Sequence, residues 1–168
     1  MHRLFRIAVP PLAMIAVAVA SLVPAAAQSP EDQLALIALS NRLDAAVDAK
    51  DWAAARAVFA DEIDVAFGAD PVTMPADDLV GMWAQALYAD KASFHLRGGH
   101  IVTFDGPDAA RIASKGYAWN LLPGFEGGAL WEVWGDYVYD AARVDGDWKL
   151  TRFDFTATHE RGNAAVRT

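Results

Sequence analysis

The spacing of apolar residues changes once along this 168-residue chain, and that change constrains the fold more than any other feature. Up to about residue 90, apolar residues recur every three or four positions, which predicts helices with one buried face. From residue 93 onward they alternate in long runs separated by turn residues, which predicts strands. Because the helices come first and the strands later, we predict an α+β domain in which helices pack on an antiparallel sheet.

Three segments of the first half carry helix signals. The first starts after Ser29, a predicted N-cap followed by proline, and its apolar residues recur at helical spacing as far as Val47. The second is predicted at 50–62 and the third at 74–88. Between these two, "DVAFG" at 64–68 predicts a short strand.

Four long strands are predicted in the second half, arranged as two hairpins. The first pair is separated by the turn sequence "DGPD", and the second pair by Asp145-Gly146, a strong hairpin signal. The loop between the hairpins, "NLLPGFEGG", is rich in glycine and proline and is a candidate pocket rim. The predicted strands cover residues 93–104, 109–120, 129–144 and 147–159. We predict one domain over 28–160 and a disordered tail over 161–168.

The first 27 residues have the features of a secretory signal peptide. Arg3 and Arg6 precede an apolar run, which ends in three alanines at 25–27, typical of a cleavage site before Gln28. We therefore predict an exported protein, periplasmic or secreted, that does not contact the membrane after cleavage. The alternative interpretation is a retained membrane anchor.

The mature chain is acidic and lacks cysteine. Loss of Arg3 and Arg6 with the leader changes the formal net charge from −8 to −10. A surface of this sign repels nucleic acid, which we do not expect as a partner. Zero cysteines exclude disulfides, thiolate catalysis and cysteine-bound metals. Since no glycine-rich phosphate loop and no metal-ligand spacing is present, we predict neither a cofactor nor a metal.

Two histidines stand five residues apart in "SFHLRGGHIV", and strand geometry limits what they do together. At about 3.3 Å per residue, His95 and His100 lie roughly 16 Å apart, too far to share a metal ion. In a regular strand the odd spacing also puts them on opposite faces. A β-bulge at Gly98-Gly99 would bring them to the same face. We predict His95 in a pocket and His100 further along the strand.

Several short motifs, taken in order, resemble those of the nuclear transport factor 2-like (NTF2-like) superfamily, in particular its SnoaL-like branch, over about residues 31–157. They are "DAKDW", "VTFDGPDA" and "VDGDWKL". Within that superfamily, "VDAKDW", "MPADDLVGM" and "HLRGG" are most similar to the scytalone dehydratase family, whose members remove water from a cyclic hydroxyketone without a cofactor. The resemblance implies a cone-shaped barrel of N-terminal helices packed on a curved antiparallel sheet, a buried pocket, and a homodimer.

The resemblance also assigns candidate catalytic residues. His95 stands where that family has one of two catalytic histidines, and Asp48 where it has a carboxylate that orients a histidine. Asn120 stands at the position of the second histidine, and Val47 and Val65 stand where the family has two tyrosines. Each candidate also has a structural interpretation: His95 as a satisfied core residue, Asp48 as a cap at a helix junction, Asn120 as a turn residue.

Large aromatic residues are predicted to form the pocket wall and bind the substrate. Strand alternation puts Trp131 and Tyr137 on the inner face of their strand, opposite Glu132 and Trp134. The predicted substrate-binding residues are Trp83, Tyr117, Trp119, Trp131 and Tyr137.

Three hypotheses for function remain open. The first is a cofactor-independent lyase or isomerase, dehydratase-like, in which His95, Asp48 and Asn120 act on a small cyclic or aromatic compound bearing a carbonyl or hydroxyl group. The second is a non-catalytic binder of a small apolar ligand. The third is a structural or interaction module that dimerises through its sheet.

Overall fold

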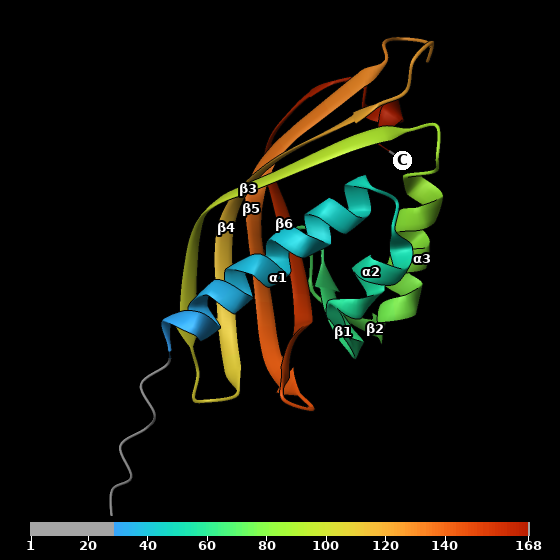
Figure 1. Ribbon diagram of the computed structural model, residues 1–168. Helices are drawn as coiled ribbons and strands as arrows, with labels where there is room; N and C mark the ends of the chain where they lie inside the picture. The colour runs from blue at the N-terminus through green and yellow to red at the C-terminus, as the bar shows by residue number, and fades with distance from the viewer. Residues whose placement is uncertain (1–28, 168) are drawn as a thin grey trace, which may run out of the picture.

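The computed structural model describes residues 29–167 and shows three helices packed on a curved sheet of six strands (Figure 1). The predicted signal peptide at 1–27 lies outside the described residues. The helices are α1 (Pro30–Asp48), α2 (Trp52–Ala57) and α3 (Ala76–Ala86). No helix of the described part is long and apolar enough to cross a bilayer.

The sheet is open, with strand order β2-β1-β6-β5-β4-β3. All neighbouring pairs are antiparallel except β1 with β6, which is parallel. Its strands are β1 (Phe59–Ala66), β2 (Val72–Pro75), β3 (Ala92–Phe104), β4 (Ala109–Leu121), β5 (Leu130–Val144) and β6 (Asp147–Gly162). The predicted α+β class with helices on a curved sheet is confirmed, and the sheet does not close into a complete barrel.

Helix α1 begins and ends at signals that its sequence carries. The hydroxyl of Ser29 accepts a hydrogen bond from the backbone N–H of Asp32 at 3.1 Å, which caps the first turn. At the other end, the N–H of Lys50 donates to the carbonyl of Val47, and the N–H of Asp51 donates to that of Ala46. These two bonds form a Schellman motif, which requires the left-handed backbone that Lys50 adopts at φ 60°.

The segment after α1 differs from the prediction of a helix over 50–62. Asp51 caps α2 through a bond from the N–H of Ala54, but α2 lasts only six residues. Strand β1 begins at Phe59. Ile63 and Val65, two residues apart as on one face of a strand, are buried together with Phe59. β2, which the sequence did not indicate, pairs with β1 where the third helix was expected to start.

A β-bulge in β3 brings the two histidines to one face. The β3–β4 register shifts between Gly98 and Ile101, and Gly99 adopts a φ of 64°. His95 lines a cavity on the inner face, and His100, on the same face, contacts Ser40 of α1. The bulge alternative is therefore confirmed.

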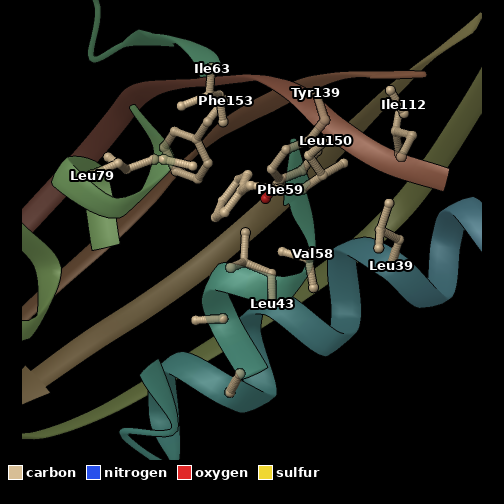
Figure 2. Packing of buried hydrophobic residues seen from close by; sticks show 14 of the residues in the cluster. Leu39, Leu43, Val58, Phe59, Ile63, Leu79, Ile112, Tyr139, Leu150 and Phe153 are labelled. Atoms are coloured by element: carbon tan, nitrogen blue, oxygen red, sulfur yellow. The ribbon is translucent and has the colours of Figure 1, made fainter. Parts of the chain in front are cut away.

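The main core lies between α1, α3 and the inner face of the sheet. Figure 2 shows Leu39 and Leu43 of α1 directed toward sheet residues that include Leu150. Leu150 and Tyr139 are fully buried. This packing holds α1 against the inner face of the sheet.

The C-terminal segment is ordered, unlike the disordered tail predicted for 161–168. β6 runs to Gly162, and a 3-10 helix, η1 (Ala164–Val166), follows it. Val166 is fully buried in a second apolar cluster with Ala118, Trp131 and Val133. The burial of this one apolar side chain explains why the segment packs rather than frays.

The bulge generates a stability prediction. Gly99→Ala should destabilise the protein by about 1 kcal/mol, because an alanine is strained at positive φ. No other atom lies within 4 Å of the added methyl, so the cost is in the backbone alone. Urea unfolding measures it. Gly98→Ala, equally open but without positive φ, should stay within about 0.5 kcal/mol. Equal effects of the two variants would contradict the bulge.

Candidate functional site

A cavity of about 210 Å³ opens between α1, α3 and the inner face of β3–β6. Its volume is below the roughly 300–1,000 Å³ of drug-sized ligand sites, so it suits a small molecule. Most of its lining is apolar, including Val47, Trp83 and Phe153. The polar lining residues are Asp44, His95, Arg97, Asn120 and Arg167.

Asp48 and His95 form a tightly bonded pair at this cavity. Nδ1 of His95 lies 2.7 Å from Oδ1 of Asp48, and the backbone N–H of His95 donates to Oδ2, also at 2.7 Å. Asp48 is the last residue of α1, and His95 is the fourth of β3. The two side chains are 21% and 17% exposed, and of the two it is His95 that lines the cavity.

The surroundings of Asp48 keep it ionised. Burial by itself raises the pKa of the Asp48 carboxyl, but hydrogen bonds from the His95 ring and backbone and from Ser93 outweigh burial. The pKa of Asp48 is therefore lowered from its ordinary value. An ionised carboxylate only accepts hydrogen bonds, so Nδ1 of His95 carries a hydrogen, and in the neutral ring Nε2 then has the free electron pair.

A lysine and a serine extend this pair outward. The hydroxyl of Ser93 donates to Oδ1 of Asp48 at 3.0 Å, and Nζ of Lys50 donates to the same hydroxyl at 2.7 Å. Burial lowers the pKa of Lys50, the charge of Asp48 opposes that effect, and the charge of Lys91 adds to it. The result is a continuous chain of hydrogen bonds from Lys50 to the ring of His95.

Arg97 occupies the same face of β3, two residues beyond His95. Its Nη2 pairs with Oδ1 of Asp44 at 2.8 Å, and its Nε donates to the hydroxyl of Tyr139 at 3.3 Å. The guanidinium carbon lies 3.2 Å from the ring centroid of Tyr137. Gly116, opposite Arg97 on β4, allows this stack, because a Cβ there would come within 2.3 Å of the Tyr137 ring.

One donor of this guanidinium has no partner. The Arg97 side chain is 2% exposed, yet its Nη1 makes no hydrogen bond. Burial raises the pKa of Asp44, and the charge of Arg97 partly opposes the rise. A buried donor without an acceptor is unfavourable, and such groups in native proteins are commonly satisfied by water or a ligand.

His100 is further from the cavity, as predicted, and contacts α1. Its Nε2 lies 3.3 Å from the hydroxyl of Ser40. Burial and the charge of Arg97 lower the pKa of His100. His100 does not line the cavity, so the two histidines have separate environments.

The other predicted catalytic residue, Asn120, lines the cavity from β4. It is 5% exposed, and its side-chain amide donates to the backbone carbonyl of Arg167 at 3.3 Å. It thus connects β4 to the C-terminal segment. The structure brings Asn120, His95 and Asp48 to one region, with only the last two hydrogen-bonded to each other.

Three of the five predicted substrate-binding aromatics line the cavity. Trp83, Trp131 and Tyr137 do so. Tyr117 and Trp119 lie on the opposite face of the sheet, which corrects the prediction for both. Cavity-lining positions on β4 are even-numbered, and strand alternation directs these two residues outward.

The outward pair makes its contacts on that other face. The hydroxyl of Tyr117 donates to Glu132 at 2.7 Å, and the ring of Trp119 stacks on Phe94 with centroids 5.8 Å apart. Glu132 in turn accepts from Arg161. These residues therefore belong to the exterior of the sheet rather than to the site.

The sequence interpretation missed Asp44 and Arg97. One signal was available: Asp44 precedes Asp48 by four residues, one helical turn, and Arg97 follows His95 by two residues, the strand period. Both therefore share a face with the predicted pair. Among residues 29–167, no group of three or more histidine and carboxylate side chains is arranged to hold a metal ion.

The site can be compared with known proteins. No curated protein matches the chain in sequence. A crystal structure of Kfla4162 from Kribbella flavida matches with a TM-score of 0.75 and 29% identity, covering 82% of this chain and 97% of that one.

Two further crystal structures are similar at 16% identity, which shows a shared fold alone. One, from Novosphingobium aromaticivorans, is provisionally named a scytalone dehydratase; its TM-score is 0.70, over 79% of this chain and 88% of that one. The other is the hexachlorocyclohexane dehydrochlorinase LinA-type3 from Novosphingobium barchaimii, with a TM-score of 0.66, over 82% and 94%.

The family assignment rests on a match along most of the chain. The model of the SnoaL-like domain matches residues 28–154, which include α1, the β3 bulge and all the polar residues at the cavity except Arg167. The chain therefore belongs to the SnoaL-like domain family, within the NTF2-like fold.

Proposed function

We propose that this protein is a cofactor-independent lyase or isomerase, dehydratase-like, acting on a small cyclic compound that bears a carbonyl group. The observation that carries the proposal is the Asp48–His95 pair at a small apolar cavity. The carboxylate holds the ring in the tautomer whose Nε2 accepts a proton, and a histidine transfers protons near neutral pH. Apolar walls exclude water from that transfer.

Arg97 supplies a complementary group for the substrate oxygen. Arg97 lines the cavity, and its unpartnered Nη1, which is buried at rest, is a charged donor that a small shift of the guanidinium would bring to a carbonyl oxygen gaining negative charge during proton removal. On β3 the Cα atoms of His95 and Arg97 are about 6.6 Å apart, on one face. Both residues line the same cavity, so the proposed base and the proposed oxyanion donor serve one site.

The proposed steps need no oxidant or second reactant. Nε2 of His95 removes a proton from the carbon beside the carbonyl, and the electron pair moves onto the carbonyl oxygen, held by Arg97. The carbonyl then re-forms while a hydroxyl group leaves the next carbon as water, taking the proton that His95 received. If the substrate has a carbon–carbon double bond next to that α carbon instead of a hydroxyl, the electron pair spreads over both double bonds. His95 then returns the proton to the far end, and the double bond moves next to the carbonyl.

The names of the structural neighbours are consistent with an elimination. A dehydratase removes water and a dehydrochlorinase removes hydrogen chloride. The identity to both is low, so their substrates do not transfer to this chain, and the proposal depends on the site itself.

The second candidate function is non-catalytic binding of a small apolar ligand. The observation that favours it is Asn120, whose amide is bonded to the backbone of Arg167 at the position where the resembled family has its second histidine. The apolar Val47, at a family tyrosine position, also lines the cavity.

Replacing the base separates the two candidates. His95→Gln should lower kcat/KM by about 10²- to 10⁴-fold, because the proton acceptor is lost. The substrates to use are cyclic ketones with a hydroxyl group on the carbon beyond the α position, found by thermal shift and assayed for water loss.

The matched control is His159→Gln, on β6, whose ring lies against Trp134 outside the cavity. It should keep full turnover. Ligands that stabilise both proteins but are converted by neither would reject the enzyme and support the binder.

We also propose export through the predicted leader, to the periplasm or the exterior. The support is the basic start, apolar run and alanine-rich end of residues 1–27. Mass spectrometry of the protein from cell fractions should find an N-terminus at Gln28 outside the cytoplasm. A cytoplasmic protein that begins at Met1 would contradict export.

We further propose a homodimer formed through the outer sheet face. Phe94 and Leu96 of β3 are 40% and 56% exposed there, beside the outward aromatics of β4 and β5. Leu96→Arg should convert a dimer to a monomer in light scattering, since a buried unpaired charge opposes association. Leu34→Arg, on α1 and 67% exposed, should stay dimeric. A wild-type monomer would contradict this proposal.

A further inference from the structure

Lys50 adopts a backbone conformation that its side chain disfavours. It has a φ of 60°, at the position after the α1 C-cap, where the Schellman motif requires a left-handed residue. Glycine is the usual residue there, because a Cβ is strained at positive φ. Lys50 and Asp145 are the two non-glycine residues between 29 and 167 with positive φ. A strained residue beside a candidate site raises the question of what its side chain does.

The side chain of Lys50 reaches the Asp48–His95 pair through one serine. Nζ donates to Oγ of Ser93 at 2.7 Å, Ser93 donates to Oδ1 of Asp48 at 3.0 Å, and Oδ1 lies 2.7 Å from Nδ1 of His95. The chain joins the end of α1 to the start of β3. Lys50 can take part in this hydrogen-bonded chain because it lies directly after the C-cap of α1.

We propose that Lys50 is a positioning residue for His95, acting through Ser93 and Asp48, and this rests on the proposed function of His95 as a base. An ammonium group has donors only, so Oγ of Ser93 must accept from Lys50. The single hydroxyl hydrogen of Ser93 then points to Asp48. Without Lys50, that hydroxyl is free to rotate away from the carboxylate.

With Lys50 present, the carboxylate is held from three directions. Oδ1 accepts from Ser93 and from the His95 ring, and Oδ2 accepts from the His95 backbone. Each contact restricts the rotation of the carboxylate and therefore of the ring bonded to it. Such outer contacts orient a reactive side chain without touching the substrate.

The charged groups around this chain explain why a lysine suits the position. The negative charge of Asp48 faces Lys50 from the end of α1, and Lys91, before β3, adds a positive charge nearby. Lys91 is 1% exposed, and its Nζ has no hydrogen-bond partner. Arg97 and Asp44, one step further along β3 and α1, are paired with each other. Among these cations, Lys50 is the one that is linked to Asp48 by hydrogen bonds, through the hydroxyl of Ser93.

The test is Lys50→Gly, which removes the ammonium and the strain together. The melting temperature should stay unchanged or rise by about 3 °C, since glycine fits the left-handed position. The proton NMR signal of the His95 Nδ1–H, sharp in the wild type, should broaden or disappear as the ring loses its fixed orientation. With a substrate in hand, kcat should fall about 10-fold with KM little changed.

Two variants control the test. Asp145→Gly makes the same change at the other left-handed residue, in the β5–β6 turn, and should leave the His95 signal intact. Lys50→Arg keeps a charged donor and should retain the signal and most of kcat. If the His95 signal in Lys50→Gly stays as sharp as in the wild type, the proposal is overturned. Loss of the signal in Asp145→Gly would overturn it as well.

The NMR signal needs no substrate, so the two proposals fail in different ways. If His95→Gln keeps full turnover, His95 is not the base, whatever Lys50 does. If His95→Gln abolishes turnover while Lys50→Gly leaves the signal and kcat unchanged, the base stands and the positioning role of Lys50 is wrong.

Discussion

Three polar contacts between α1 and β3 determine how the rest of the molecule is arranged. Ser40, Asp44 and Asp48, spaced by four residues, meet His100, Arg97 and His95 in that order. Ser40 and His100 do not line the cavity, whereas Asp44, Arg97 and His95 do. Because each pair joins a different turn of α1 to a different residue of β3, α1 cannot slide by a turn without breaking all three pairs. The contacts therefore fix the register of a helix that apolar packing alone would leave variable.

This arrangement depends on the two glycines of β3. Without a bulge at Gly98 and Gly99, residues beyond it would reverse their faces, and the contact between Ser40 and His100 would be lost to the exterior. The extra residue also bends the strand, which curves the sheet around the cavity. The sequence "HLRGGH" therefore encodes two things at once, the curvature of the sheet and the alignment of its polar side chains with α1.

Strong periodicity made the helices, the long strands and the turn at Asp145-Gly146 predictable. The limits of α2 and β1 were not predictable. The spacing of Ala55, Val58 and Phe59 is consistent with a continuing helix, and it is the pairing of β1 with β6, distant in sequence, that makes Phe59 part of a strand. Tyr117 and Trp119 were misplaced because aromatic character does not tell the two faces of a strand apart. Arg97 was missed because a charged residue in a strand indicates exposure unless its partner on a distant helix is known.

The arginines that line the cavity are paired with carboxylates, and that pairing limits the ligand. Arg97 is neutralised by Asp44, and Asp48 faces Lys50 through Ser93. Arg167, the other arginine that lines the cavity, is paired with Glu160 at 3.7 Å. A carboxylate ligand would have to lose its hydration in an apolar cavity whose arginines already have carboxylate partners, which is costly. A neutral carbonyl compound avoids that cost at rest. In the proposed mechanism, the negative charge that develops on its oxygen strengthens the interaction with Arg97, which then favours the transition state over the bound ground state.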